Sequence, residues 1–205
     1  MSNHILRRKV RKVRAVRSLG SAGVAETLGP AVRGLNVCGV VGGAFGLIEV
    51  VDYLVAAAPG ADVSVSVWSS GGADLSHAFR MIKAGRMRSC RFIVDPSFEK
   101  RAPELCALLV EFFGADSIRT ASTHKKVVVV RNSRLAFCVR ASMNLQAERQ
   151  LEVLDVTESP KVCDWYGAQF DAEFAAGESP EVDGADYFSD EVFGKDLRRV
   201  GLRFS

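Results

Sequence analysis

The chain has 205 residues, of which 48% are hydrophobic and 25% are charged. This composition is typical of a folded globular protein and excludes a fibrous or wholly disordered chain, and the length suffices for one sizeable core. The five cysteines stand singly, with no Cys-x-x-Cys pair and no Cys/His cluster. We therefore expect reduced, buried thiols rather than a disulfide framework or a zinc site.

The net charge of +3 is unevenly distributed. Seven basic residues and no acidic residue precede position 20, so the rest of the chain carries 20 basic and 24 acidic residues. Residues 162–194 contain no lysine or arginine. We divide the chain into a basic arm (residues 1–33), a folded domain (34–176) and an acidic tail (177–205). The arm either binds nucleic acid, in competition with the tail, or is simply solvated.

Strands and helices alternate along the folded domain. The expected elements are a strand at 36–41, a helix at 45–57, a strand at 63–68, a helix at 74–84, a strand at 90–94, a helix at 103–113, strands at 117–120, 125–130, 134–140 and 150–156, and a helix at 160–175. Three rounds of strand and helix predict parallel strands, and the later hairpin adds antiparallel neighbours. The expected fold class is α/β, with a mixed, mostly parallel sheet and helices on both faces.

Residues 35–58 are apolar enough to resemble a membrane span. However, Glu49 and Asp52 lie within them, and four glycines interrupt the segment. Carboxylates are costly near the middle of a bilayer. A strand, a glycine turn and an amphipathic helix explain the segment better, so we expect a cytoplasmic protein with no membrane contact.

Polar residues gather at the ends of short apolar strands after residue 120. His124 and Lys126 are two apart, so their side chains should project to the same face of a strand. Ser142 and Asn144 follow the next strand, and Glu152 lies in the one after it. Histidine can attack or protonate a phosphate, and lysine, amide and hydroxyl groups can hold its oxygens, without a metal or other cofactor.

The pattern His124-x-Lys126, Ser142-x-Asn144 and Glu152 resembles the active-site signature of the phospholipase D superfamily. That family includes lipases, phosphatidyltransferases, metal-independent nucleases and phosphodiesterases that clean DNA ends. The resemblance is best over residues 118–156. It implies a phospholipase D-like fold and a catalytic set made of the five residues just named.

In this interpretation His124 attacks phosphorus and forms a phosphohistidine. The alternative for His124 is a strand-end histidine bonded to a carbonyl. Glu152 would fix the tautomer of His124, or it is a surface carboxylate paired with Arg149. The mechanism implied by the family also needs a second histidine to protonate the leaving oxygen, and neither His4 nor His77 has a lysine two residues later. We therefore expect a two-fold homodimer in which the two copies of His124 share one site.

Basic residues around the motif and in the arm can contact a phosphate backbone, or they are merely solvated. The candidate nucleic-acid-binding residues are Arg131, Arg134, Arg140 and Arg149 near the motif and Arg8, Lys9, Arg11 and Lys12 in the arm. Trp68, which ends its predicted strand, either packs in the core or stacks on a base.

Three functions follow from these patterns. The first is a dimeric, metal-independent phosphodiesterase, a nuclease acting on nucleic acid, with DNA favoured over RNA but the choice between them left open by the sequence. The second is a nucleic-acid-binding module with impaired catalysis, because Arg131 stands where the family usually has Asp and Ala141 where it usually has Gly. The third is a structural or assembly protein.

Overall fold

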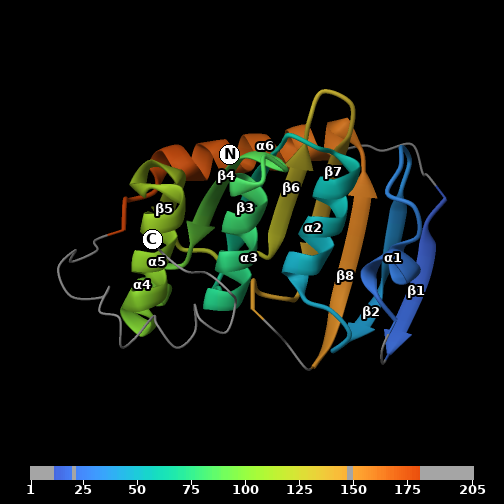
Figure 1. Ribbon diagram of the computed structural model, residues 1–205, viewed down its shortest axis with the longest axis horizontal. Helices are drawn as coiled ribbons and strands as arrows, with labels where there is room; N and C mark the ends of the chain where they lie inside the picture. The colour runs from blue at the N-terminus through green and yellow to red at the C-terminus, as the bar shows by residue number, and fades with distance from the viewer. Residues whose placement is uncertain (1–11, 20–21, 147–149, 181–205) are drawn as a thin grey trace, which may run out of the picture.

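A computed structural model describes residues 12–19, 22–146 and 150–180 of the chain (Figure 1). The strands are β1 (Arg14–Leu19), β2 (Asn36–Gly42), β3 (Ala61–Val67), β4 (Met87–Val94), β5 (Ile118–Thr120), β6 (Val127–Arg131), β7 (Ala136–Ala141) and β8 (Leu151–Glu158). The helices are α1 (Val24–Leu28), α2 (Leu47–Ala57), α3 (Gly72–Lys83), α4 (Pro96–Arg101), α5 (Pro103–Phe113) and α6 (Pro160–Ala176), with a short 3-10 helix at Ala115–Ser117.

The described strands form one sheet in the order β1-β2-β8-β7-β6-β3-β4-β5. β1 pairs with β2, β3 with β4, and β4 with β5 in parallel, whereas the four pairings that involve β6, β7 and β8 are antiparallel. This confirms the expected α/β fold with a mixed sheet. The parallel share is smaller than expected, because β8, β7 and β6 lie between the parallel groups β1-β2 and β3-β4-β5 and make only antiparallel pairings.

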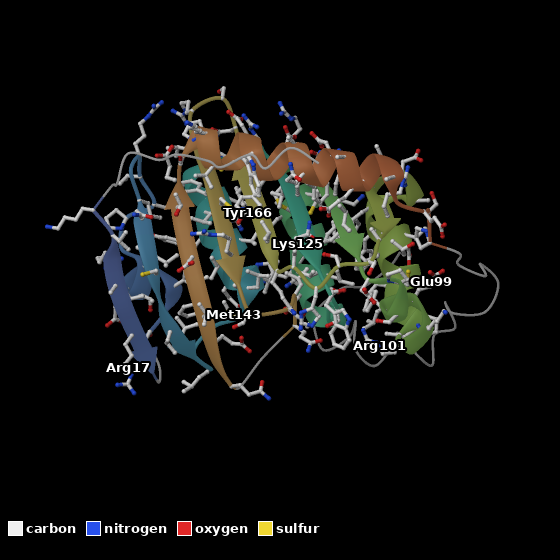
Figure 2. The ribbon with its side chains drawn as sticks, turned by 180° about the vertical axis from the view of Figure 1, so that it is seen from behind. Arg17, Glu99, Arg101, Lys125, Met143 and Tyr166 are labelled. Atoms are coloured by element: carbon white, nitrogen blue, oxygen red, sulfur yellow. The ribbon has the colours of Figure 1, made fainter. Side chains whose placement is uncertain are left out.

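The two faces of the sheet are covered differently. One face packs against α1, α2, α3 and α5 in a large apolar core that includes Leu54, Leu75 and Leu109. The other face is covered in part by α6, through a small cluster around Val129 and Cys163 (Figure 2). Helices therefore lie on both faces, as expected.

Side-chain alternation explains this division. In β3, Val63 and Val65 are buried in the large core, whereas Ser64 and Ser66 face α6. The apolar segment before residue 58 forms β2 and α2, joined by a glycine-containing turn, as expected. No described helix is long and apolar enough to cross a membrane. All five cysteines are free, and four of them are buried, again as expected.

The sheet begins earlier in the chain than the sequence pattern indicates. β1 and α1 lie within the segment assigned to the basic arm, and Arg14 there donates hydrogen bonds to the carbonyl oxygens of Thr27 and Leu28 at the end of α1. A Cβ atom at Gly39 would lie 2.1 Å from the carbonyl oxygen of Val16, so glycine at this position allows β1 to approach β2. The sequence pattern also does not predict the helix α4.

Candidate active site

Strand direction brings the predicted site residues to one edge of the sheet. β6 runs antiparallel to both β3 and β7, so the residues before β6 lie beside those after β3 and β7. β8 begins at the same edge, since Glu152 is opposite Val41 near the end of β2. His124, Lys126, Ser142, Asn144 and Glu152 therefore all lie at what we call the site edge.

His124 and Lys126 lie together as their spacing predicts. The Lys126 Nζ atom is 3.3 Å from His124 Nδ1 and donates a hydrogen bond to the His124 carbonyl oxygen at 3.3 Å. His124 is exposed and so can reach a ligand from solution. Lys125 points to the opposite face, where it pairs with Glu173 of α6.

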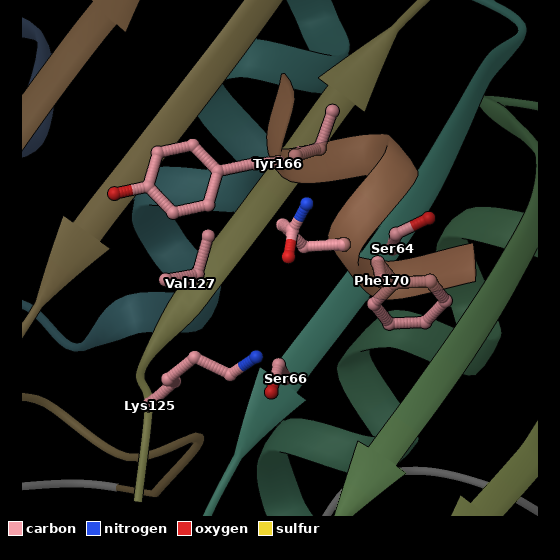
Figure 3. A pocket seen from close by; sticks show the side chains of 8 residues that line it. Ser64, Ser66, Lys125, Val127, Tyr166 and Phe170 are labelled. Atoms are coloured by element: carbon pink, nitrogen blue, oxygen red, sulfur yellow. The ribbon is translucent and has the colours of Figure 1, made fainter. Parts of the chain in front are cut away.

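A pocket lies between the sheet and α6 on that opposite face (Figure 3). Lys125 lines it together with Ser64, Ser66, Tyr166 and Phe170, among others. Neither His124 nor Lys126 lines it, so this pocket is separate from these two residues and lies on the other face of the sheet.

Ser142 and Glu152 interact directly. The Ser142 hydroxyl donates to the Glu152 carboxylate and accepts a hydrogen bond from the Val153 backbone N–H at 2.8 Å. The structure shows no hydrogen bond between Glu152 and His124. The orienting role of Glu152 therefore stays a prediction, and Arg149, its alternative partner, lies outside the described residues.

The loop that carries Asn144 is fixed to the connection between β3 and α3. The Gly71 N–H donates to the Leu145 carbonyl at 2.7 Å, and the Leu145 N–H donates to the Ser69 carbonyl at 3.3 Å. The Asn144 side-chain oxygen is buried and has no hydrogen-bond partner among the described residues. These backbone bonds hold Asn144 at the site edge.

Trp68 and Arg101 complete the surroundings of His124. The Trp68 and His124 rings lie 5.9 Å apart at 48°, and the Arg101 guanidinium lies over the Trp68 ring, 3.8 Å from its centre. The sequence pattern leaves the place of Trp68 open, and it gives no signal for Arg101. Its helix α4 has a recognisable start, because Asp95 caps it and Pro96 occupies its first turn.

The Asp95 carboxylate connects this helix to the His124 segment. It accepts hydrogen bonds from the backbone N–H groups of Ser97, at 2.9 Å, and Thr123, at 3.3 Å. Burial would raise the pKa of Asp95, but the hydrogen bonds from Ser97 and Thr123 and the positive charge of Arg101 outweigh it and lower that pKa. Asp95 thus stays ionised and holds the two segments together.

The predicted cluster of arginines is dispersed in the structure. Arg131 lies at the far end of β6 from the site edge and pairs with Asp164 of α6 at 3.1 Å. Arg134 lies in the turn that follows β6, at the same far edge. Arg140 pairs with Asp155 across β7 and β8 at 3.4 Å. Arg131, which stands where the phospholipase D superfamily usually has Asp, is therefore not adjacent to His124.

The remaining candidates lie in or near the undescribed parts of the chain. Arg8, Lys9, Arg11 and Arg149 lie outside the described residues. Lys12 is described and exposed. Among residues 12–19, 22–146 and 150–180, no group of three or more His, Cys, Asp or Glu side chains could hold a metal ion.

Comparison with known proteins finds similarity at the level of structure only. No family model and no curated protein sequence matches the chain. NucT from Helicobacter pylori matches with a TM-score of 0.50 and 12% identity, over 70% of this chain and 99% of NucT. Nuc from Salmonella typhimurium, a phospholipase D family member, matches with a TM-score of 0.48 and 15% identity, over 61% of this chain and 87% of Nuc.

A third match has a different size. Phosphatidylserine synthase from Haemophilus influenzae Rd KW20 matches with a TM-score of 0.49 and 12% identity, over 81% of this chain and 46% of the synthase. At such low identities the comparisons establish the fold and nothing further. The chain shares its fold with NucT, and the family resemblance seen in its sequence agrees with this fold.

Two carboxylates lie in the first turns of the helices that follow β2 and β3. Glu49 of α2 accepts a hydrogen bond from the Gly46 N–H at 2.9 Å, and one oxygen of Asp74 in α3 is buried without a partner among the described residues. Burial raises the pKa of Asp74 to about 6, and the negative charge of Glu49 contributes. Asp74 is therefore charged at neutral pH in an environment that disfavours its charge.

We expect Asp74→Asn to stabilise the protein at pH 8. Because the pKa of Asp74 is raised in the folded state, the folded protein holds a proton on Asp74 between pH 4 and 6, whereas the unfolded chain releases it. Protonation of Asp74 therefore stabilises the fold at low pH, and this stabilisation is lost as pH rises through about 6. The melting temperature of Asp74→Asn should exceed that of the wild type at pH 8, with the difference shrinking at pH 4. Asp116→Asn, at an exposed position, is the control. A difference that does not depend on pH contradicts this account.

Proposed function

We propose that this protein is a metal-independent phosphodiesterase that cleaves nucleic acid through a phosphohistidine on His124. The observation that supports the proposal is that the strand register puts His124, Lys126, Ser142, Asn144 and Glu152 at one edge of the sheet, in a chain whose fold is similar to that of NucT. An exposed imidazole next to an ammonium, with an amide at the same edge of the sheet, suits attack on a phosphate diester.

Each group has a role in a two-step displacement. The Nε2 lone pair of His124 forms a P–N bond while the bond from phosphorus to the leaving oxygen breaks. Lys126 and Asn144 bind the non-bridging oxygens, where negative charge grows in the transition state. Water then attacks the phosphohistidine and restores the free imidazole. In the first step a proton donor protonates the leaving oxygen, and in the second step a proton acceptor takes one proton from the attacking water.

The contact between Lys126 and His124 sets the resting state of the imidazole. An ammonium group can only donate, so at 3.3 Å it favours the tautomer in which Nδ1 accepts and Nε2 carries the proton. Attack by Nε2 needs the other tautomer. A phosphate that draws Lys126 to its oxygens frees Nδ1 to be protonated and to donate to Glu152. Substrate binding therefore prepares the nucleophile in this proposal.

A second chain supplies the missing acid in the proposed mechanism. His77 is held between α2 and α3 by Asp52, with His77 Nε2 2.8 Å from the Asp52 carboxylate, so it is already engaged. Three apolar side chains, Val40, Leu151 and Val153, are exposed on neighbouring strands at the end of the sheet that carries Glu152. Such a patch suits contact with a second copy of the chain.

Nucleic acid is the substrate that the charge distribution favours. The seven basic residues before position 20 suit a phosphate backbone, and DNA is proposed ahead of RNA. Two residues argue for impaired catalysis, because Arg131 and Ala141 stand where the phospholipase D superfamily usually has Asp and Gly. The position of Arg131, paired with Asp164 at the far edge, removes the stronger of these two reasons. A pure binding module is therefore the second candidate.

Neighbouring lysines offer a matched test of the site. We expect cleavage of labelled DNA in excess EDTA, a loss of at least about 10³-fold in His124→Asn and of about 10²-fold or more in Lys126→Ala. Lys125→Ala should stay within about threefold of the wild type, because Lys125 faces α6. The measurement is the initial cleavage rate. Equal losses in both lysine variants, or cleavage abolished by EDTA, would refute the proposed site.

Mixing variants tests the shared site. If each active centre needs His124 from both subunits, equal amounts of wild type and His124→Asn, allowed to exchange, should show about one quarter of the activity of the same total amount of wild type. Independent sites would retain about one half. The same mixture with Lys125→Ala in place of His124→Asn controls for exchange itself. An activity of one half after complete exchange contradicts the dimeric mechanism.

A further inference from the structure

We propose that Trp68 and Arg101 form a stacking platform that holds an unpaired base beside the phosphate attacked by His124. This inference rests on the proposed function and deepens it by naming the substrate class, single-stranded nucleic acid. The platform joins two elements that are distant in sequence, the end of β3 and the end of α4.

Stacking geometry is the first argument. The Arg101 guanidinium lies 3.8 Å from the centre of the Trp68 ring, which is van der Waals stacking distance. Trp68 is partly buried and Arg101 is exposed, so a ligand can reach the Arg101 side chain from solution. Bases of single-stranded nucleic acid stack on both aromatic rings and guanidinium planes.

Proximity to the nucleophile is the second argument. The Trp68 ring centre lies 5.9 Å from that of His124. A base on the outer side of Arg101 would therefore belong to a nucleotide close to the phosphate that His124 attacks. Because a base in a duplex has both faces covered by its neighbours, the platform favours a strand whose bases are unpaired.

The charge of Arg101 is the third argument. Two arginines on the α6 side of the sheet are neutralised in this structure: Arg91 pairs with Asp171 and Arg131 with Asp164. Arg101 has no carboxylate within ion-pair distance among the described residues; its only side-chain hydrogen bond there is to the Ser97 hydroxyl, at 3.4 Å. Its positive charge is therefore available to a nucleotide.

The platform is also held in place. Asp95 caps α4, which carries Arg101, and the same carboxylate accepts the Thr123 N–H beside His124. One side chain thus sets the position of the guanidinium relative to the nucleophile. A fixed stacking surface loses little conformational freedom on binding, which suits recognition.

The test separates stacking from charge by using a strand without bases. Binding of three fluorescent probes is measured by anisotropy with full-length His124→Asn: a 12-nucleotide oligothymidine, an abasic strand of the same length, and a hairpin duplex. We expect oligothymidine to bind about tenfold or more tighter than the abasic strand. Adding Arg101→Lys, which keeps the charge and loses the planar group, should remove most of this difference.

Two variants control for folding and for general charge. Arg119 also lies over an aromatic ring, 4.8 Å from the centre of Phe174, so adding Arg119→Lys should leave the preference for bases intact. Trp68→Phe keeps an apolar ring at a partly buried position and should weaken the preference less than Arg101→Lys does. Equal binding of the oligothymidine and abasic strands, or an unchanged preference in the Arg101→Lys variant, overturns the platform.

The closing comparison distinguishes this inference from the proposed function. Hydrolysis of bis(p-nitrophenyl) phosphate by the wild-type protein in EDTA reports the chemistry without any base. If hydrolysis is absent but the protein still prefers oligothymidine to the abasic strand in a way that depends on Arg101, the catalytic proposal fails. The platform then stands as part of a binding module. If hydrolysis depends on His124 but bases have no effect on binding, the platform fails and the catalytic proposal stands.

Discussion

The antiparallel pairing of β6 with its two neighbours is the constraint on which the site depends. His124 and Lys126 precede β6, and only an antiparallel β6 places them beside the ends of β3 and β7. The hydrogen-bonded register then brings Glu152 to the same edge from the start of β8. A shift of this register by one residue would turn Val128 and Val130 out of the core, so apolar burial and the geometry of the site are specified together.

In the described part of the chain, positively charged side chains are paired on the face that α6 covers but not at the site edge. On the side of α6, cations are paired with acids of that helix: Arg131 with Asp164, Arg91 with Asp171, and Lys125 with Glu173. At the site edge, Lys126 and Arg101 have no carboxylate partner among the described residues. Unpaired positive charge is therefore concentrated where the proposed substrate phosphate would bind.

Local patterns predicted most of the fold and part of the site. The spacing of His124 and Lys126 predicts a common side and places Lys125 on the other, because strand periodicity is a local property. Position 131 shows the limit of such reasoning. Arg131 follows Lys126 closely in sequence, yet β6 carries it to the opposite edge of the sheet. There it pairs with Asp164 of α6, a helix that comes much later in the chain.

Contacts between distant segments could not be derived from the sequence. The stacking of Arg101 on Trp68 depends on how α4 packs against the end of β3, and the bond from Ser142 to Glu152 depends on the pairing of β7 with β8. A local signal did exist for α4, in the cap Asp95 and the proline that follows it. The strand β1 had a weaker signal, because Arg14 and Arg17 interrupt its apolar residues.

Trapping the covalent intermediate tests the central claim most directly. The wild-type protein would be quenched at alkaline pH during turnover of DNA in excess EDTA, digested, and mapped by mass spectrometry. We expect a nucleotide attached through phosphorus to His124, with no such adduct in His124→Asn. Metal-free cleavage that proceeds with no adduct on His124, or with the adduct on another residue, would contradict it.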